Sequence, residues 1–146
     1  MEHIQVRYIT LHPEAKPPVY NHGFLEDAGA DLHSVERVVV HAGSGQLVRT
    51  GLAIELPPGY EGQVRTRSGM AKQGLVVANS PGTIDPSYRG EIGVIMWNLS
   101  KTDKLIEAGD RIAQLVVARY AGCEFHPADS LSESERGAGG FGSTGR

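Results

Sequence analysis

The sequence predicts an all-β fold, a jelly-roll-like β-barrel with one short helix and a mobile, glycine-rich C-terminal arm. Three observations support this prediction. Nineteen glycines and eight prolines in 146 residues favour numerous turns rather than long helices. Several apolar segments of strand length follow one another at short intervals. The sequence also lacks the alternation of strand and helix that is typical of a parallel sheet, so a barrel or jelly roll is expected.

The length and composition indicate one globular domain. Hydrophobic residues make up 40% of the chain and charged residues 21%, which is ordinary for a soluble protein. We expect a single β-barrel domain over residues 1–128 and a flexible arm over residues 129–146. The formal net charge is −3, and no cluster of lysine and arginine occurs, so the sequence argues against binding to duplex nucleic acid.

Targeting and metal-binding patterns are equally sparse. The N-terminus lacks a basic segment followed by an apolar core, and no apolar run is long enough to span a bilayer. We therefore expect a cytoplasmic protein without a membrane partner. Cys123 is the single cysteine, which excludes an internal disulfide, and the histidines lack the spacing of a structural zinc site. We interpret Cys123 as a small apolar side chain near a strand.

The first third of the chain predicts two strands and an acidic turn. Residues 3–10 alternate between apolar and polar side chains, which is typical of a half-buried strand. Residues 26–34 are small, acidic and turn-forming, and residues 37–40 form the next expected strand. Asp31 lies in the acidic segment. We favour an Asx turn, in which its carboxylate accepts hydrogen bonds from the local backbone, over a ligand-binding role.

The middle of the chain predicts a β-hairpin followed by a short helix. Residues 47–56 and 60–67 read as two strands joined by a tight turn at residues 57–59. Residues 68–74 form the helix, with Ser68 as N-cap and Gly74 after its end. Its exposed amides, beside Arg67, favour an anion such as phosphate. A capped turn with a surface arginine is an equally good interpretation.

Residues 79–93 are the most distinctive stretch. Two strands, residues 75–78 and 92–97, flank it and predict a second hairpin. Prolines and glycines restrict its backbone, so it presents backbone donors and acceptors at fixed positions. Asp85, Tyr88 and Arg89 lie on this loop. It is either a small-molecule site or simply a turn.

The last third predicts two strands and the arm. Residues 104–106 form one strand, and residues 112–118 form another that is buried on both faces. Gln114 interrupts the second, so its amide either bonds to the backbone or points to a ligand. The glycine-dense arm is either a disordered end or a segment that closes over a nucleotide, with Phe141 stacking on a base.

Taken together, five segments resemble the five motifs of the trimeric dUTP diphosphatase (dUTPase) family, in family order. They are residues 28–32 (AGADL), 67–71 (RSGMA), 82–91 (GTIDPSYRGE), 109–116 (GDRIAQLV) and 136–145 (RGAGGFGSTG). The resemblance implies a jelly-roll-like homotrimer with active sites shared between subunits. It also implies hydrolysis of dUTP to dUMP and pyrophosphate, which keeps uracil out of DNA and supplies dUMP for dTMP synthesis.

The resemblance further implies roles for individual residues. Asp85 resembles the general base that activates the attacking water, and Tyr88 the residue that packs against deoxyribose. Asp31 resembles the aspartate that places Mg²⁺ through water. The full set of implied substrate-binding residues is Arg67, Ser68, Gly69, Asn79, Thr83, Ile84, Asp85, Tyr88, Gly93, Gln114, Arg136, Phe141, Gly142 and Ser143. Within this set, Asn79 and the backbone of residues 83–85 read uracil, Phe141 covers the base, and the arginines hold phosphates.

Two departures and three alternatives accompany the resemblance. Thr66 stands where a proline is common and Met70 where leucine is common, and we interpret both as packing differences. A dCTP deaminase is similar in fold but uses a glutamate and a second serine after the Arg-Ser pair, where this chain has Gly69. A catalytically silent nucleotide-binding protein would lack the base or the arm, and a purely structural β-trimer would not need Phe141.

Overall fold

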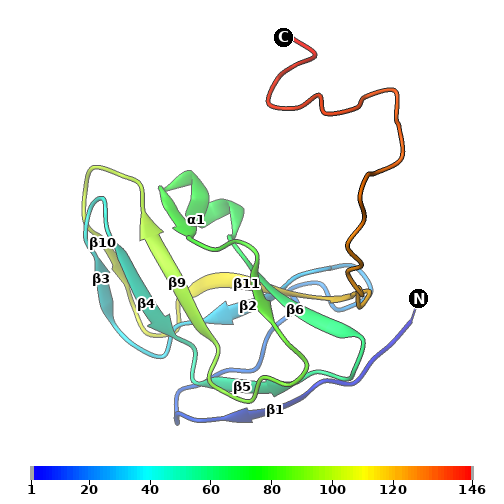
Figure 1. Ribbon diagram of the computed structural model, residues 1–146. Coiled ribbons are helices and arrows are strands. Elements are labelled where there is room, and N and C mark those ends of the chain that lie inside the picture. Colours follow the sequence, from blue (N-terminus) through cyan, green and yellow to red (C-terminus); the bar gives the residue numbers. More distant parts are fainter. Residues whose placement is uncertain (1, 146) are drawn as a thin grey trace.

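The structure is a computed structural model that describes residues 2–145. It confirms the all-β, jelly-roll-like prediction: eleven strands and one short helix form within the described residues (Figure 1). The elements are β1 (Arg7–Thr10), β2 (Ala30–His33), β3 (Val38–Val40), β4 (Gly45–Arg49), β5 (Leu52–Glu55), β6 (Tyr60–Arg65), α1 (Ser68–Lys72), β7 (Leu75–Val77), β8 (Gly82–Ile84), β9 (Gly93–Asn98), β10 (Lys104–Ile106) and β11 (Arg111–Arg119). No described helix is long and apolar enough to cross a membrane.

The strands pair antiparallel in four sheets. The largest has the order β2-β11-β6-β8, and a second has the order β4-β9-β7. Two-stranded sheets, β1-β5 and β10-β3, complete the barrel. Strand β6 is the central member of the large sheet, since β11 pairs on one side of it and β8 on the other. Elements far apart in sequence are therefore neighbours. The motif at residues 67–71 follows β6 directly in the chain, and the motif at residues 82–91 begins with β8, which pairs with β6.

One hydrophobic core lies between the sheets. The core residues with little or no exposed surface include Leu32, Val40, Val48, Leu52, Val94, Met96, Ile106 and Ile112. Strand β9 shows the reason for the pattern, because its residues alternate strictly between exposed and buried. Asn98, at its end, is fully buried but satisfied: Nδ2 donates to the carbonyl oxygens of Val40 and Thr102, and Oδ1 accepts from Ser100. Met70, one of the two departures, packs against this core as expected.

Several expected elements differ from the structure. The N-terminal strand begins at Arg7 rather than residue 3, and all four of its residues are exposed rather than half-buried. The expected strand 47–56 is divided into β4 and β5 at Gly51, which has a positive φ of 66°. These strands belong to different sheets, and neither pairs with β6. The hairpin expected from residues 47–67 is therefore wrong: the turn at residues 57–59 connects strands that pair elsewhere.

Strand β11 is longer than expected and less uniformly buried. Its buried residues are Ile112, Ala113 and Leu115, whereas Val116 and Val117 are half-buried. The pairing with β2 shifts register between Arg111 and Ala113. Such a bulge places two consecutive side chains in the core, which explains why this segment reads as continuously apolar.

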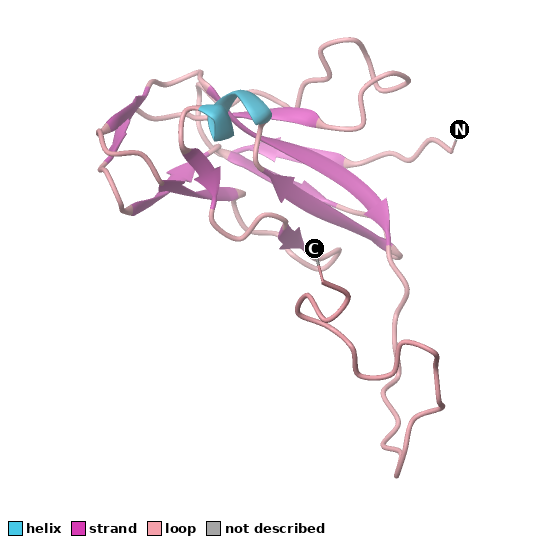
Figure 2. Ribbon diagram, turned by 90° about the horizontal axis from the view of Figure 1, so that it is seen from above, coloured by secondary structure: helices cyan, strands magenta, loops and turns pink. Residues whose placement is uncertain are grey.

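The arm lies apart from the barrel. The last strand ends at Arg119, and residues 120–145 contain no helix or strand. Figures 1 and 2 show this segment leading away from the sheets in both views. Cys123 lies in it with an exposed side chain, so its interpretation as a packed apolar residue is wrong. The start of the expected arm at residue 129 remains a prediction, and its last residue, 146, lies outside the described residues.

Candidate active site

The hairpin around residues 79–93 is held by two sheets. Strands β7 and β9 pair as predicted, with Val76 opposite Trp97. The connection between them is more regular than expected, since β8 forms within it and pairs with β6. Gly82 lies opposite Val64, and Thr83 lies opposite Gln63. The loop thus acquires the rigidity of a sheet, which fixes the positions of its backbone donors and acceptors.

A pocket of about 160 Å³ opens on this hairpin. It brings together six of the residues expected to bind substrate, namely Asn79, Thr83, Ile84, Asp85, Tyr88 and Gly93. Val64, Gly82, Glu91 and Ile92 complete its wall. We call it the hairpin pocket. The Asp85 carboxylate is exposed, and no group within residues 2–145 donates a hydrogen bond to it, so it is available to accept one from water or ligand.

The side chain of Tyr88 is folded back along the loop. Its hydroxyl donates to the carbonyl oxygen of Glu91 at 2.8 Å. Only glycine fits at residue 90 with the ring in this place, because a Cβ atom there would lie 2.6 Å from Cζ of Tyr88. The ring is 45% exposed and borders the hairpin pocket. It therefore presents a flat apolar wall to whatever occupies that pocket.

A second pocket, of about 360 Å³, opens at the start of α1. We call it the helix pocket. Its lining includes five residues singled out from the sequence, namely Asp31, Arg67, Ser68, Gly69 and Gln114. The helix differs from the prediction at its first residue: Arg67, with φ −82° and ψ 139°, is the N-cap, and no side chain caps the helix. The expected capping role of Ser68 is therefore wrong, and its hydroxyl is exposed at the pocket.

Asp31 lies at the base of the helix pocket and is buried, with 5% of its surface exposed. Oδ1 accepts from Nε of Arg67 at 2.7 Å, and Oδ2 accepts from Nδ2 of Asn21 at 3.0 Å. Nη1 of Arg111 lies 3.4 Å from the same Oδ2. The Asx-turn interpretation is wrong, since Asp31 belongs to β2 and lies opposite Gln114 of β11. Its charge is balanced by two arginines instead of by the local backbone.

The amide of Gln114 bonds to the backbone, as one of its two interpretations expected, and its role toward a ligand stays a prediction. Nε2 donates to the carbonyl oxygen of Thr66 at 3.1 Å, and the side chain also lines the helix pocket. Gly29 packs directly against this amide, because a Cβ atom at residue 29 would lie 3.2 Å from Cδ of Gln114. Gly29 of the first motif therefore leaves the space that the side chain of Gln114 of the fourth motif occupies.

The far rim of the helix pocket was not singled out from the sequence. It consists of His22, Glu26 and Asp27, next to Asn21 and Ala28. Asp27 accepts from the backbone N–H of His22 at 2.7 Å and lies 3.0 Å from Nδ1 of its ring. These two interactions, the backbone one first, lower the pKa of Asp27. No functional role for these rim residues followed from the sequence, and Arg111, although it lies in the fourth motif, was not among the implied substrate-binding residues; the fold brings Arg111 to Asp31.

Within residues 2–145, no group of three or more histidine, cysteine and acidic side chains could hold a metal ion. The two Asp31 oxygens already accept hydrogen bonds. A single paired carboxylate does not make a protein cage for a cation. The Asp31 carboxylate does fit a Mg²⁺ ion that keeps several waters and takes its remaining oxygen ligands from phosphate groups.

The two pockets and the arm remain separate within one chain. The residues that line either pocket do not include the expected arm residues Arg136, Phe141, Gly142 and Ser143. The side chain of Arg136 donates to the carbonyl oxygen of Gly139 at 2.8 Å, and Phe141 is fully exposed. One chain therefore carries two pockets that share no lining residue, and we refer to these pockets as half-sites.

Thr66 connects the two half-sites within the chain. Its hydroxyl accepts from the backbone N–H of Val77 at 2.9 Å, and its own N–H lies 3.2 Å from Oγ of Ser80. Its carbonyl oxygen holds Gln114, and the next residue is Arg67. A proline could make neither of the first two bonds. The interpretation of Thr66 as a packing difference is therefore wrong, because the residue acts through hydrogen bonds.

Comparison with known proteins identifies a family that this chain resembles. A family model described as dUTPase matches residues 16–145. A deoxyuridine 5'-triphosphate nucleotidohydrolase of Solibacter usitatus is 54% identical over 144 residues, which cover 98% of this chain and 97% of the relative. One of Picosynechococcus sp. is 48% identical over 143 residues, covering 97% and 99%.

Solved structures agree with these sequence relatives. A dUTPase variant of Staphylococcus bacteriophage 80alpha with bound dUpNHpp superposes with a TM-score of 0.88 at 29% identity, covering 97% of this chain and 99% of that chain. A dUTPase variant of S. aureus phage phi11, described with a structural Mg(II) ion, gives a TM-score of 0.80 at 25% identity, covering 89% and 100%.

The Thr66 network predicts a stability difference between two small substitutions. Thr66→Val keeps the shape but leaves the N–H of the buried Val77 without a partner, which should cost about 1–3 kcal/mol of unfolding free energy. Thr66→Ser keeps the hydroxyl and should lose less. Urea unfolding of both variants beside the unsubstituted chain measures this difference. Equal stability of the two variants would contradict a role for the hydroxyl.

Proposed function

This chain belongs to the dUTPase family and is a dUTP diphosphatase, and we propose that Asp85 activates the water that hydrolyses dUTP to dUMP and pyrophosphate. The observation that carries the proposal is the hairpin pocket, in which an unpaired carboxylate lies beside Asn79, Tyr88 and the exposed backbone of β8. In the cytoplasm this reaction would keep uracil out of DNA and supply dUMP for dTMP synthesis.

The hairpin pocket is the proposed nucleoside site. Asn79 and the backbone of residues 83–85 offer donors and acceptors to the edge of uracil, and Gly93 leaves the opposite wall without a side chain. A small pocket of about 160 Å³ supports the proposal of a site for one pyrimidine ring. Tyr88 packs against the sugar, where it leaves no room for a 2′-hydroxyl.

The helix pocket is the proposed phosphate site. Arg67 supplies a charged donor whose Nε donates to Asp31 and whose Nη1 donates to the carbonyl oxygen of Arg111 at 3.3 Å. Its Nη2 is left for phosphate oxygens. The backbone of Ser68 and Gly69 adds amide donors at the start of α1. When bound, Mg²⁺ neutralises charge on the triphosphate and the leaving pyrophosphate. Asp31 would hold it through its waters, and Gln114 would reach the phosphate chain.

The chemical step is an in-line displacement at the α-phosphorus. Asp85 accepts a proton from a water molecule as the water oxygen forms a bond to this phosphorus. The bond between the α-phosphorus and the oxygen bridging to the β-phosphate breaks, and its electron pair leaves with pyrophosphate. A positioned base of this kind contributes roughly a hundredfold to ten-thousandfold in rate.

We propose that a homotrimer joins the two half-sites. Leu47, Ile95 and Trp97 lie exposed on the same outer face of the β4-β9 pair, since Leu47 is opposite Ile95 in the register. An apolar sheet face of this kind fits a second copy of the chain. Phe125 and Leu131 of the C-terminal segment are about nine-tenths exposed, so this segment also has apolar groups that a neighbouring subunit could cover.

The arm is the proposed cover of the assembled site. Phe141 would stack on uracil, while Arg136, Gly142 and Ser143 would contact the phosphates. Phe141 has a positive φ of 52° and no contact that buries its ring. This exposure supports a ring that finds its partner in the ligand rather than in its own barrel.

Substrate selectivity tests the proposal directly. Pyrophosphate release should be fast with dUTP and at least about a hundredfold slower with UTP, dTTP and dCTP, and it should fall when Mg²⁺ is removed. An ion-exchange assay with each nucleotide, with and without EDTA, measures this. Ammonia release from dCTP would favour the deaminase reading, and nucleotide binding without turnover would favour a silent binding protein.

Replacement of the proposed base separates binding from chemistry. Asp85→Asn should keep the melting temperature and the affinity for dUMP but lower kcat by at least about a hundredfold. Asp103→Asn, which changes an exposed aspartate paired with His41, is the matched control and should keep full turnover. Unchanged kcat in Asp85→Asn would remove this residue from its role.

Removal of the arm tests its role as a cover. Deletion of residues 136–146 should leave the melting temperature nearly unchanged, because the described part of this segment makes no strand, while kcat/KM falls steeply. Differential scanning calorimetry and steady-state kinetics report the two effects. A large drop in melting temperature would instead mean that the arm is a structural element of the assembly.

The outer face of β4-β9 predicts the interface of the trimer. Ile95→Lys should shift the assembly toward monomer and abolish turnover, because a buried lysine loses its hydration. Ile9→Lys, on the exposed strand β1, is the control and should keep the trimer. Sedimentation velocity measures both. A trimer that persists in Ile95→Lys would place the interface elsewhere.

A further inference from the structure

Glu91 occupies the end of the hairpin loop and has no part in the mechanism above. Its side chain is 24% exposed and borders the hairpin pocket. Oε1 accepts from the backbone N–H of Gly51 at 2.8 Å, and Oε2 accepts from Nε of Arg49 at 3.0 Å. Both carboxylate oxygens are thus held by the corner between β4 and β5, on a part of the chain distant in sequence.

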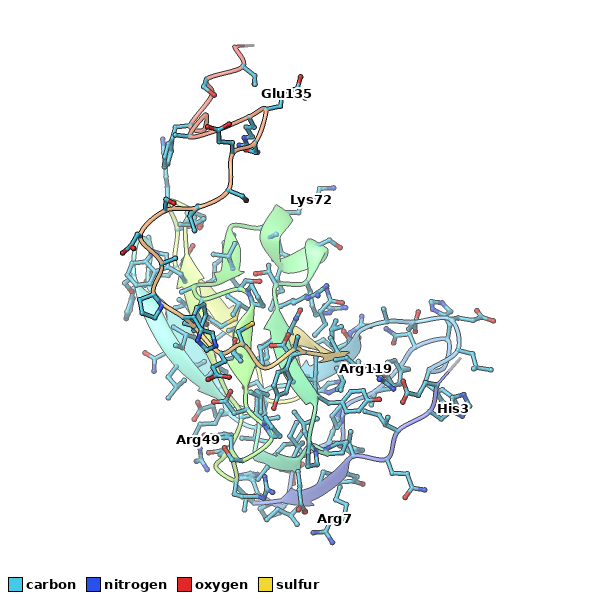
Figure 3. All side chains as sticks on the ribbon, turned by 45° about the vertical axis from the view of Figure 1, so that its right-hand side comes forward. His3, Arg7, Arg49, Lys72, Arg119 and Glu135 are labelled. Atoms are coloured by element: carbon cyan, nitrogen blue, oxygen red, sulfur yellow. The ribbon has the colours of Figure 1, made fainter. Side chains whose placement is uncertain are left out.

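The neighbouring backbone reinforces this connection. The N–H of Ile92 donates to the carbonyl oxygen of Leu52 at 2.7 Å, and the hydroxyl of the buried Thr50 donates to the carbonyl oxygen of Ile92 at 2.6 Å. Figure 3 shows Arg49 at the lower edge of the barrel, at the opposite end from Lys72 of α1. The residues that line the helix pocket include neither Arg49 nor Glu91.

The carbonyl oxygen of Glu91 is the acceptor for the Tyr88 hydroxyl. The absence of a Cβ atom at Gly90 leaves room for the Tyr88 ring beside the loop. The hydrogen bond to the carbonyl oxygen of Glu91 then fixes the position of the ring. A shift of the Glu91 backbone would carry the hydroxyl with it. The wall that faces the sugar would then move as a unit.

We propose that Glu91 is a positioning residue that sets the selectivity for deoxyribose over ribose, by fixing the carbonyl oxygen that holds Tyr88. This inference rests on the proposed function, in which Tyr88 excludes the 2′-hydroxyl. Glu91 does not touch the substrate in this role. Arg49 and Gly51 hold its carboxylate, its backbone holds the phenol, and the phenol closes the space beside the sugar.

The test is the ratio of kcat/KM for dUTP to kcat/KM for UTP, measured on one preparation. A general loss of folded enzyme cancels in this ratio. Glu91→Ala should lower the ratio by about tenfold or more, which corresponds to about 1.4 kcal/mol of differential binding. Glu91→Gln, which keeps one acceptor oxygen, should lower it less. Where UTP turnover is too slow to detect, the ratio of the inhibition constants of UMP and dUMP measures the binding part of this selectivity and should fall in the same variants.

A matched control comes from another ion pair. Glu107 lies 3.3 Å from Nε of Arg37, and both side chains are at least half exposed. Glu107→Ala should leave the dUTP to UTP ratio unchanged. Sedimentation velocity on every variant separates an effect on selectivity from an effect on assembly, since Arg49 borders the proposed subunit interface.

A double-mutant cycle identifies the path through Tyr88. Tyr88→Phe removes the hydroxyl that Glu91 holds, so adding Glu91→Ala to it should lower the ratio no further. Additive effects, or an unchanged ratio in Glu91→Ala while the unsubstituted enzyme discriminates, would overturn the inference. If the unsubstituted enzyme fails to hydrolyse dUTP, the proposed function fails instead. If Glu91→Ala does not fold, Glu91→Gln in the same cycle decides the question.

Discussion

The pairing of β6 with β8 on one side and β11 on the other is the constraint on which the rest of the structure depends. Val64 forms part of the hairpin pocket, and two residues later the chain leaves β6 to become the start of α1. Gly62 shows how close this approach is, since a Cβ atom there would lie 3.1 Å from Cβ of Ile84. One strand thus fixes the distance between a nucleoside half-site and an anion half-site.

Charge is organised around a single buried carboxylate. Asp31 would be costly to bury alone, and its pairing with Arg67 and Arg111 removes this cost. The same pairing holds Arg67 at the start of a helix whose first amides have no side-chain cap. An anion is the natural partner for such a helix start. The net charge of −3 does not by itself oppose binding of a triphosphate, because Arg67 and the uncapped amides provide local positive groups at the helix pocket.

The separation of the two pockets gives the proposed trimer its physical reason. A nucleotide placed in the hairpin pocket of one subunit needs phosphate ligands that the same subunit offers elsewhere. The exposed apolar face of β4-β9 and the exposed side chains of residues 125 and 131 offer surfaces for the other copies. In the proposed function, specificity for the base and sugar depends on this loop. Thr66 and Glu91 hold the loop to the barrel near its two ends.

The sequence by itself determined the all-β class, strand 104–106, most of the last strand, and the pocket residues that belong to the recognised motifs. These are local patterns: alternation, turn residues and motif composition act over a few neighbours. Only the tertiary structure decided that Asp31 belongs to a buried strand, that residues 47–56 divide between two sheets, and that Thr66 is a hydrogen-bonding residue. Each depends on partners 11 or more residues away: Arg67 for Asp31, Thr10 for Leu52 in the divided segment, and Val77 for Thr66. A contact at that separation leaves no periodic trace in the sequence.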